Sequence, residues 1–189
     1  MLGSRKQGTR KLALALVVSL LAAGCERYSP VDPAWVRWDN RPTTAPGQAN
    51  GRLDTSRLTV IDSHCSIWSD AAPSLRALLE DAKRDDVLLA PEECYRDYQG
   101  QVYWRNLWCW FGHCENAAVP GTSNHGWAKA IDLKDQQGEL VFGSPGWVWM
   151  RAHAATYGWN WPWPGTSAYG AEPWHFEWVG DGGQLFAPT

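Results

Sequence analysis

The sequence predicts an α+β domain, because strand-like and helix-like segments mix without the regular strand–helix–strand repetition of doubly wound folds. Two observations support this class. Residues 73–84 have helical periodicity, and residues 174–179 alternate between apolar and polar like a strand. The 189 residues allow one domain of ordinary size with flanking segments, and no internal repeat is visible.

The first half of the domain is expected to hold two strands and two helices. LTVID at 58–62 and VLLA at 87–90 are strand candidates. A helix is predicted over 73–84, where apolar residues recur at helical spacing: Leu75, Leu78, Leu79 and Ala82. Pro73 suits its first turn. A second helix is expected over 97–110.

The second half continues with a hairpin and a third helix. AIDL at 130–133 and ELVF at 139–142 can pair around the turn QQG. Ser144 as the N-cap and Pro145 at the first position begin the helix, and Gly158 follows its end.

The first 24 residues form a processing signal. Their basic start is followed by the apolar run LALALVVSLLAA, which is too short to span a bilayer comfortably. LAAGC resembles the lipobox of bacterial lipoproteins and predicts lipid attachment at Cys25. Plain secretion is the alternative, and both readings place the protein outside the cytoplasm.

Residues 25–51 are rich in proline and are expected to tether the anchor to a folded domain at 52–189. The leader carries 4 of the 17 basic residues and no acidic one. The rest of the chain therefore has 13 basic and 20 acidic residues and a net charge of −7. That charge argues against a nucleic-acid partner, which would require a basic face. Membrane contact is expected only through the lipid anchor.

Four cysteines remain after Cys25, and an even number in an exported chain indicates two disulfides. Cys109 and Cys114 are close in sequence and are expected to pair, which leaves Cys65 with Cys94. The alternative is a structural zinc site, since CWFGHC contains a histidine between the two cysteines.

Asp132 stands in the apolar run AKAIDL, where a lone buried carboxylate is costly unless it binds a cation. His125, seven residues earlier, offers a second ligand. A third is available in EPWHFEW, where strand alternation places His175 and Glu177 on the face opposite the aromatic residues. The alternative is a hydrogen-bonded cluster without metal.

Glu172 precedes Pro173, which restricts it to extended or polyproline geometry. With three residues per polyproline turn, Glu172 and His175 would lie on one side. Two histidines and an aspartate leave one position of a tetrahedral zinc ion for water, whose pKa zinc lowers to roughly 7. With Glu172 to take and return a proton, these are the parts of a zinc amide hydrolase.

Three motifs in this order resemble the VanY/VanX-type zinc D-alanyl-D-alanine peptidases, and together they cover roughly residues 52 to 180. They are CYRDYQGQ at 94–101, S-x-H-x(6)-D at 123–132 and EPWHFEW at 172–178. The resemblance implies an α+β fold with a small antiparallel sheet, packed helices and zinc in a cleft.

The resemblance also implies site roles. His125, Asp132 and His175 would hold zinc, Glu172 would be the catalytic base, and Arg96 would stabilise the oxyanion of the tetrahedral intermediate.

Ser123 and Gln101 would hydrogen-bond the peptide substrate. The chain departs from the family pattern at Ala128, where glycine is usual, and at Lys129, where a small or apolar residue is common. Alanine costs energy at that position if the backbone needs a positive φ.

The expected function is that of an exported zinc peptidase acting on peptidoglycan stem peptides, foremost a D-alanyl-D-alanine carboxypeptidase. Relatives with similar motifs cut dipeptides, L-Ala-D-Glu links or L,D-bonds. The alternative is a non-catalytic, zinc-containing cell-wall binding module, suggested by the tryptophans of YGWNWPWPG at 157–165, although that segment can also be a self-packed loop. Glu172 favours the enzyme, because a structural zinc needs a fourth ligand and no base.

Overall fold

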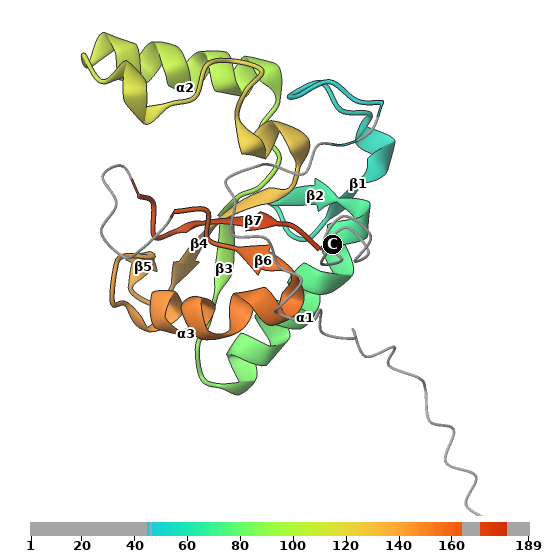
Figure 1. Ribbon diagram of the computed structural model, residues 1–189, viewed down its shortest axis with the longest axis vertical. Helices are drawn as coiled ribbons and strands as arrows, with labels where there is room; N and C mark the ends of the chain where they lie inside the picture. Colours follow the sequence, from blue (N-terminus) through green and yellow to red (C-terminus); the bar gives the residue numbers. More distant parts are fainter. Residues whose placement is uncertain (1–44, 46, 164–170, 181–189) are drawn as a thin grey trace, which may run out of the picture.

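A computed structural model describes residues 45, 47–163 and 171–180 (Figure 1). The predicted leader at 1–24, Cys25 and most of the predicted tether lie outside the described residues. Within the described part of the chain, no helix is long and apolar enough to cross a membrane.

An antiparallel sheet forms the centre of the domain, with strand order β3–β4–β7–β6 and the short β5 paired to β4. Its strands are β3 (Ala90–Glu93), β4 (Ala130–Asp135), β5 (Gly138–Glu139), β6 (Trp159–Asn160) and β7 (His175–Trp178). A separate pair consists of β1 (Leu58–Val60) and β2 (Ser66–Trp68). The α+β class with an antiparallel sheet is therefore confirmed.

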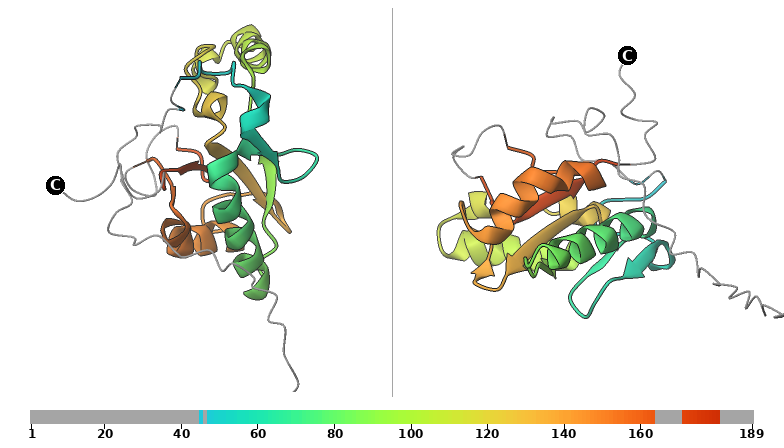
Figure 2. Two further views of the ribbon diagram at one scale, coloured as in Figure 1. Left: turned by 90° about the vertical axis from the view of Figure 1, so that its right-hand side faces the viewer. Right: turned by 90° about the horizontal axis from the view of Figure 1, so that it is seen from below.

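Two helices, α1 (Ala72–Arg84) and α3 (Pro145–His153), pack against the sheet, whereas α2 (Tyr98–Trp110) projects away from it (Figures 1 and 2). In α1 the predicted stripe of Leu75 and Leu78 is fully buried, and each such leucine contributes about 1.5–3 kcal/mol. Short 3₁₀ helices connect these elements: η2 (Thr55–Arg57), η3 (Ser69–Ala71), η4 (Cys114–Asn116), η5 (Asn124–Trp127) and η6 (Ala154–Tyr157).

The third helix begins as predicted. The Ser144 hydroxyl accepts a hydrogen bond from the Trp147 N–H at 3.3 Å, and Pro145 is the first helical residue. The last turn tightens into η6, which ends at Gly158 with φ of 75°.

The strand predicted at 87–90 is wrong. A turn at residues 85–86 follows α1, and residues 87–89 after it have no regular secondary structure. The Val87 N–H donates to the Ala82 carbonyl at 2.9 Å. β3 begins only at Ala90 and has the sequence APEE, which local propensity disfavours. Its place at the edge of the sheet tolerates Pro91, because an edge strand can lose one N–H without breaking the ladder.

The predicted hairpin after β4 is present, but its second strand is shorter than expected. β5 ends at Glu139, whereas the prediction ran to 142. The Ser144 N–H donates to the Val141 carbonyl at 2.9 Å, so the chain already turns towards α3 there. Val141 and Phe142 are exposed as a result.

The tryptophan-rich segment at 157–165 mostly belongs to the core. Trp159 and Trp161 are fully buried, and Trp161 meets Trp147 edge-on with ring centroids 4.8 Å apart. Residues 164 and 165 lie outside the described residues. The self-packed interpretation is confirmed for Trp159 and Trp161, so these two tryptophans are not available to a cell-wall ligand, whereas Trp163 is half-buried.

Both predicted disulfides are present, Cys65–Cys94 and Cys109–Cys114. The two cysteines of CWFGHC bond to each other, so the alternative zinc site at this motif is wrong. Cys65 and Cys94 are buried and connect the residue before β2 to the residue after β3.

The end of the predicted tether packs onto the domain. The Gly51 N–H donates to the Gly126 carbonyl at 2.8 Å, and the Gly51 carbonyl accepts from the Tyr98 N–H at 2.8 Å. Ala45 is also buried. The folded part therefore begins before residue 52.

Candidate metal centre

Asp132, His125 and His175 form a compact group of potential metal ligands. In the antiparallel register, Asp132 on β4 lies directly opposite His175 on β7, while His125 comes from η5. Asp132 Oδ1 is 2.9 Å from His175 Nδ1 and 3.3 Å from His125 Nε2. Ligand atoms of the three residues lie within 4.8 Å of one another. The pairing of β4 with β7 thus unites residues that are far apart in the sequence.

The spacing and chemistry of these donors fit a zinc ion. Zinc bonds to nitrogen and oxygen are about 2.0–2.2 Å long, so neighbouring ligands of a tetrahedral ion lie roughly 3.3 Å apart. The two contacts of Asp132 Oδ1 are close to that separation. Two imidazole nitrogens and one carboxylate also leave the fourth position open, as in catalytic zinc sites.

The electrostatics of the group suit a cation. Burial raises the pKa of the Asp132 carboxyl, but the charges and hydrogen bonds of His125 and His175 outweigh it and hold that pKa far below its ordinary value. Burial lowers the pKa of His175, yet hydrogen bonds to Asp132 and Glu177 raise it to about 10. In the metal-free protein these shifts favour the positively charged form of His175 beside the negatively charged form of Asp132.

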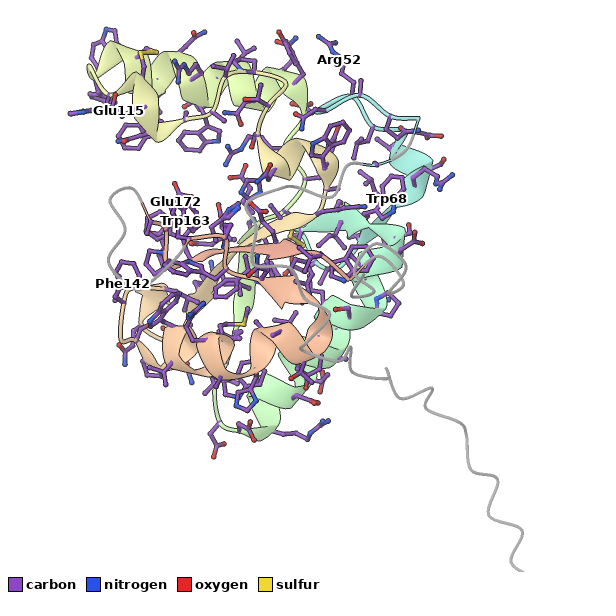
Figure 3. All side chains as sticks on the ribbon, in the orientation of Figure 1. Arg52, Trp68, Glu115, Phe142, Trp163 and Glu172 are labelled. Carbon is purple, nitrogen blue, oxygen red and sulfur yellow. A yellow bond between two sulfur atoms is a disulfide. The ribbon has the colours of Figure 1, made fainter. Side chains whose placement is uncertain are left out.

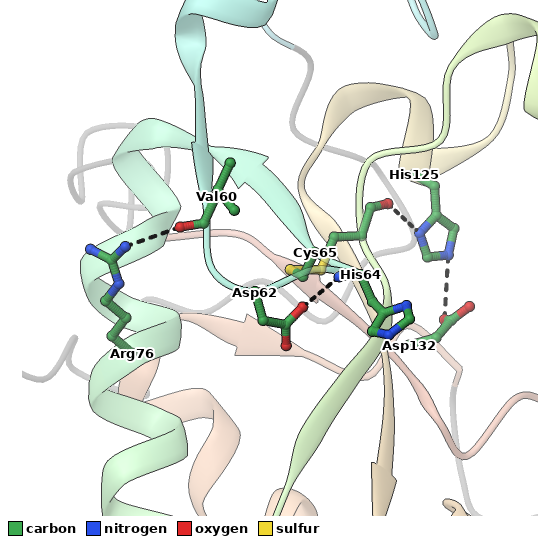
Figure 4. The surroundings of a disulfide bond; sticks show 8 residues. Val60, Asp62, His64, Cys65, Arg76, His125 and Asp132 are labelled. Atoms are coloured by element: carbon green, nitrogen blue, oxygen red, sulfur yellow. Dashed lines mark hydrogen bonds and ion pairs between the residues drawn. A yellow bond between two sulfur atoms is a disulfide. The ribbon is translucent and has the colours of Figure 1, made fainter.

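The ring of His125 is oriented by the backbone carbonyl of Cys94. Its Nδ1 lies 2.8 Å from the Cys94 carbonyl oxygen, so Nδ1 carries the donated proton and Nε2 is left for Asp132 and a metal (Figure 4). The buried disulfide to Cys65 holds Cys94 in turn. One backbone carbonyl thus connects this disulfide to the orientation of a ligand.

Glu172 lies next to the group, at the start of the turn that leads into β7. The His175 N–H donates to the Glu172 carbonyl at 3.2 Å, which closes a four-residue turn in place of the expected polyproline geometry. Burial raises the pKa of the Glu172 carboxyl, and the charges of the three potential ligands and of Arg96 all act on it. Figure 3 shows Glu172 on the side of the sheet nearest to α2.

Arg96 is held in a fixed orientation. Its Nε donates to Glu93 Oε1 at 2.6 Å, and its Nη2 donates to the other oxygen of the same carboxylate. Its Nη1 donates to Gln101 Oε1 at 2.8 Å. Gln101 is 2% exposed, and its amide donates to the Ala118 carbonyl at 2.7 Å. Both ends of the Gln101 amide therefore have a partner within the protein, and Gln101 helps to orient Arg96. Its contact with a substrate stays a prediction.

Ser123 lies immediately before η5 and is buried. Its carbonyl accepts a hydrogen bond from Asn50 Nδ2 at 2.7 Å, and its side chain makes no capping hydrogen bond to η5. The contact of its hydroxyl with a substrate stays a prediction. Asn50 also approaches Gly126 so closely that a Cβ there would lie 2.1 Å from Asn50 Oδ1. A larger residue at position 126 would push Asn50 off the ligand-bearing turn.

The two departures from the family pattern each have a structural counterpart. Ala128 is left-handed, with φ of 54°, which costs roughly 1–2 kcal/mol for a residue with a Cβ. Lys129 is buried, with Nζ 5.7 Å from the centre of the Trp68 ring and 5.5 Å from that of Trp178. Cation–π attraction between these rings and the ammonium group favours a lysine at this position.

Three residues of the site have no role in the sequence analysis: Glu93, Asn124 and Glu177. Glu177 Oε1 lies 3.1 Å from His175 Nε2, and Asn124 Nδ2 donates to the same oxygen. The sequence did contain a signal for Glu177, because strand alternation places it on the face of His175. The other two meet their partners through the turns of the fold, and no spacing rule predicts those contacts.

Comparisons with known proteins point to one family. The family model described as "VanY: D-alanyl-D-alanine carboxypeptidase" matches residues 64–181. A search of curated proteins finds no match.

Several solved structures share the fold. The vancomycin resistance D,D-pentapeptidase VanY of a VanB-type cassette, in complex with Zn(II), is 22% identical with a TM-score of 0.59, covering 76% of this chain and 89% of that one. The LD-carboxypeptidase LdcB is 23% identical with a TM-score of 0.60, covering 83% and 91%. The L,D-carboxypeptidase DacB of Streptococcus pneumoniae is 21% identical with a TM-score of 0.53, covering 73% and 78%.

Proposed function

The chain belongs to the VanY family of D-alanyl-D-alanine carboxypeptidases, and from this premise we propose that it is an exported zinc peptidase of peptidoglycan stem peptides. It hydrolyses the terminal D-Ala-D-Ala amide bond and releases D-alanine. The observation that carries the proposal is the convergence of His125, Asp132 and His175, with the carboxylate of Glu172 beside them.

The residues of the chain divide the chemistry among them. Zinc held by His125, Asp132 and His175 would supply a Lewis acid that lowers the pKa of the attacking water. Glu172 accepts a proton from that water as the oxygen bonds to the carbonyl carbon, and gives it to the leaving amine as the C–N bond breaks. Arg96, fixed by its own contacts, supplies positive charge for the oxyanion.

The D,D-bond is the first choice because it is the substrate bond in the family description. An L,D-bond is the second candidate. LdcB and DacB, whose names carry that activity, resemble this chain to about the same degree as the D,D-pentapeptidase does.

The proposed location is outside the cytoplasmic membrane, where the substrate lies. The sequence of residues 1–24, with lipid attachment at Cys25, would deliver and anchor the enzyme there. Two disulfides suit an oxidising compartment. Because Ala45 is buried and Gly51 is hydrogen-bonded to the domain, the tether in this proposal is shorter than residues 25–51.

The test uses the full-length chain, purified in detergent and loaded with zinc. It is incubated with a pentapeptide stem ending in D-Ala-D-Ala and, separately, with the tetrapeptide that lacks the last alanine, and the products are identified by mass spectrometry. We expect the pentapeptide to lose one alanine, and a chelator to abolish this loss. Cleavage of the tetrapeptide alone would move the specificity to the L,D-bond. If neither peptide is cut by a chain that carries stoichiometric zinc, the peptidase proposal fails.

A further inference from the structure

Glu177 is a buried carboxylate that the proposed chemistry leaves without a role. It is 4% exposed and lies on β7, two residues after His175 and on the same face of the strand. β7 pairs with β4 on one side and with β6 on the other, so Glu177 cannot turn out to solvent at a sheet edge. A carboxylate in such a place is costly unless polar partners compensate for the lost water.

Two partners compensate for it, and both belong to the metal centre. Glu177 Oε1 lies 3.1 Å from Nε2 of His175, and it also accepts a hydrogen bond from Asn124 Nδ2. Asn124 is the residue before His125 in η5. One oxygen atom thus joins the ring of one potential ligand to the turn that carries another.

The contact decides which nitrogen of His175 can bind a metal. A neutral imidazole has one N–H donor and one free nitrogen. Each nitrogen of His175 faces a carboxylate, Nδ1 that of Asp132 at 2.9 Å and Nε2 that of Glu177 at 3.1 Å. Asp132 belongs to the group of potential ligands and Glu177 does not. With a metal ion beside Asp132, the proton of the neutral ring therefore belongs on Nε2, where Glu177 accepts it, and Nδ1 is the free nitrogen. His125 has the opposite arrangement, because its Nδ1 faces the Cys94 carbonyl and its Nε2 faces Asp132.

We propose that Glu177, supported by Asn124, is a positioning residue that fixes the ring and the Nδ1-ligating tautomer of His175. The inference rests on the proposed function and deepens it. Hydrogen-bonded carboxylates behind metal-ligating histidines orient the ring and increase its basicity. The two ligand histidines are therefore held by different groups, His125 by a neutral backbone carbonyl and His175 by a charged side chain.

The experiment measures zinc affinity by competition with a chromophoric chelator, using the full-length chain. Loss of such an outer partner typically weakens metal binding about 10–100-fold, and we expect this for Glu177→Ala. Glu177→Gln keeps an acceptor oxygen but not the charge, so we expect it to lose less zinc affinity than Glu177→Ala. Asn124→Ala should lose less zinc affinity than Glu177→Gln. The matched control is Glu92→Ala, which removes an exposed carboxylate of the same sheet that pairs with Lys134 at 3.4 Å; its affinity stays at the wild-type value.

A second readout separates positioning from mere stability. Long-range proton–nitrogen NMR of the zinc-loaded chain reports which imidazole nitrogen of His175 carries the proton. We expect Nε2–H in the wild type and in Glu177→Gln, with a shifted proton resonance in the variant. Metal on Nε2 in the wild type would overturn the inference.

Zinc affinity within twofold of wild type in Glu177→Ala would overturn it as well. If Glu177→Ala does not fold, Glu177→Gln decides, and an unmoved Nε2–H resonance with unchanged affinity counts against the inference. A wild-type chain that binds no zinc refutes the proposed function itself. A chain that binds zinc and cuts the peptide, but does not respond to Glu177, refutes only the inference.

Discussion

The metal centre is fixed by contacts between residues far apart in the sequence, whereas the arm formed by α2 and η4 (residues 98–116) is held by near neighbours. His125 meets Cys94 across 31 positions, and His175 meets Asp132 across 43. In the arm, the Cys109–Cys114 disulfide closes a separation of only 5 residues. The centre therefore depends on the whole sheet, whereas the far end of the arm is held mainly by contacts within the arm.

The two regions also differ in what they expose. Trp110 at the end of α2 is 80% exposed, whereas Trp161 near the metal centre is 1% exposed. Arg105 closes the arm from within by donating to the carbonyls of Cys114 and Ala117. The difference teaches that changes on the arm surface should leave the potential ligands in place, while a change at a buried residue that contacts one of them should weaken metal binding.

The largest contrast is expected from two histidines. His175→Ala removes a ligand and should weaken zinc binding by more than about a hundredfold, beyond the loss caused by an outer-shell change. His113→Ala, on the exposed surface of the arm, should leave affinity unchanged. Both values come from competition with a chromophoric chelator. Equal affinities in the two variants would remove His175 from the ligand set.

The next contrast separates chemistry from binding. Glu172→Gln should keep stoichiometric zinc and lose about 10²–10⁴-fold in turnover, because a general base is removed. Glu115→Gln makes the same change in an exposed residue of the arm and should retain full activity. Turnover is followed as release of D-alanine from the pentapeptide. Near-normal turnover of Glu172→Gln would show that another group acts as the base.

Removal of each disulfide measures how much it stabilises its own region. Their sequence separations are 29 for Cys65–Cys94 and 5 for Cys109–Cys114. Loop-closure entropy then predicts losses of about 3.6 and about 2 kcal/mol when each pair is replaced by alanine. Urea unfolding measures both free energies. Only the first replacement should also weaken zinc binding, since Cys94 holds His125; a larger loss in the arm would reverse the comparison.

The pH dependence of zinc binding tests the electrostatic interactions of the metal centre. Because the pKa of His175 is raised to about 10 in the metal-free protein, its ring mostly carries both N–H protons at neutral pH. Zinc must displace one of these protons, so its apparent affinity should rise by about tenfold per pH unit between roughly pH 7 and 9. Chelator competition at three pH values gives the slope. A flat profile would mean that no proton is released.

The smallest effect is expected on the arm surface. Replacing Trp110 and Phe111 with serine changes two exposed side chains, so the free energy of unfolding should move by no more than about 0.5 kcal/mol. Zinc affinity and turnover should not change. A substantial loss of turnover on polymeric substrate, with normal turnover on the free pentapeptide, would show that the arm contacts the cell wall.

The group of His125, Asp132 and His175 could be predicted from sequence because each residue lies in a short motif whose spacing reflects local geometry. Asp132 is a charged residue in an apolar run, and His175 is a polar residue opposite an aromatic strand face. The disulfide pairs followed from the number and spacing of the cysteines. The burial of Trp159 and Trp161 could not be predicted, because buried and ligand-binding tryptophans look alike in sequence.

The rest depended on contacts that local patterns do not contain. β3 has the sequence APEE, and only its pairing with β4 makes it a strand. The contacts of Gln101 with Arg96 and with the Ala118 carbonyl arise from the packing of α2 against the following loop, and no sequence pattern predicts them. The sequence predicts an energetic cost at Ala128 if its φ is positive. It does not predict that Lys129 is buried beside Trp68 and Trp178, because these two tryptophans are distant in sequence.

Gly126 sets a limit on how far the chain can be trimmed. Its carbonyl accepts the Gly51 N–H, and its missing side chain leaves the space that Asn50 fills. A truncated enzyme that starts at residue 52 would therefore lose a wall of the turn that bears His125, although every catalytic residue would still be present. A truncated chain for crystallisation or assay should therefore begin upstream of Ala45. A protease that cuts between residues 47 and 51 should inactivate the enzyme.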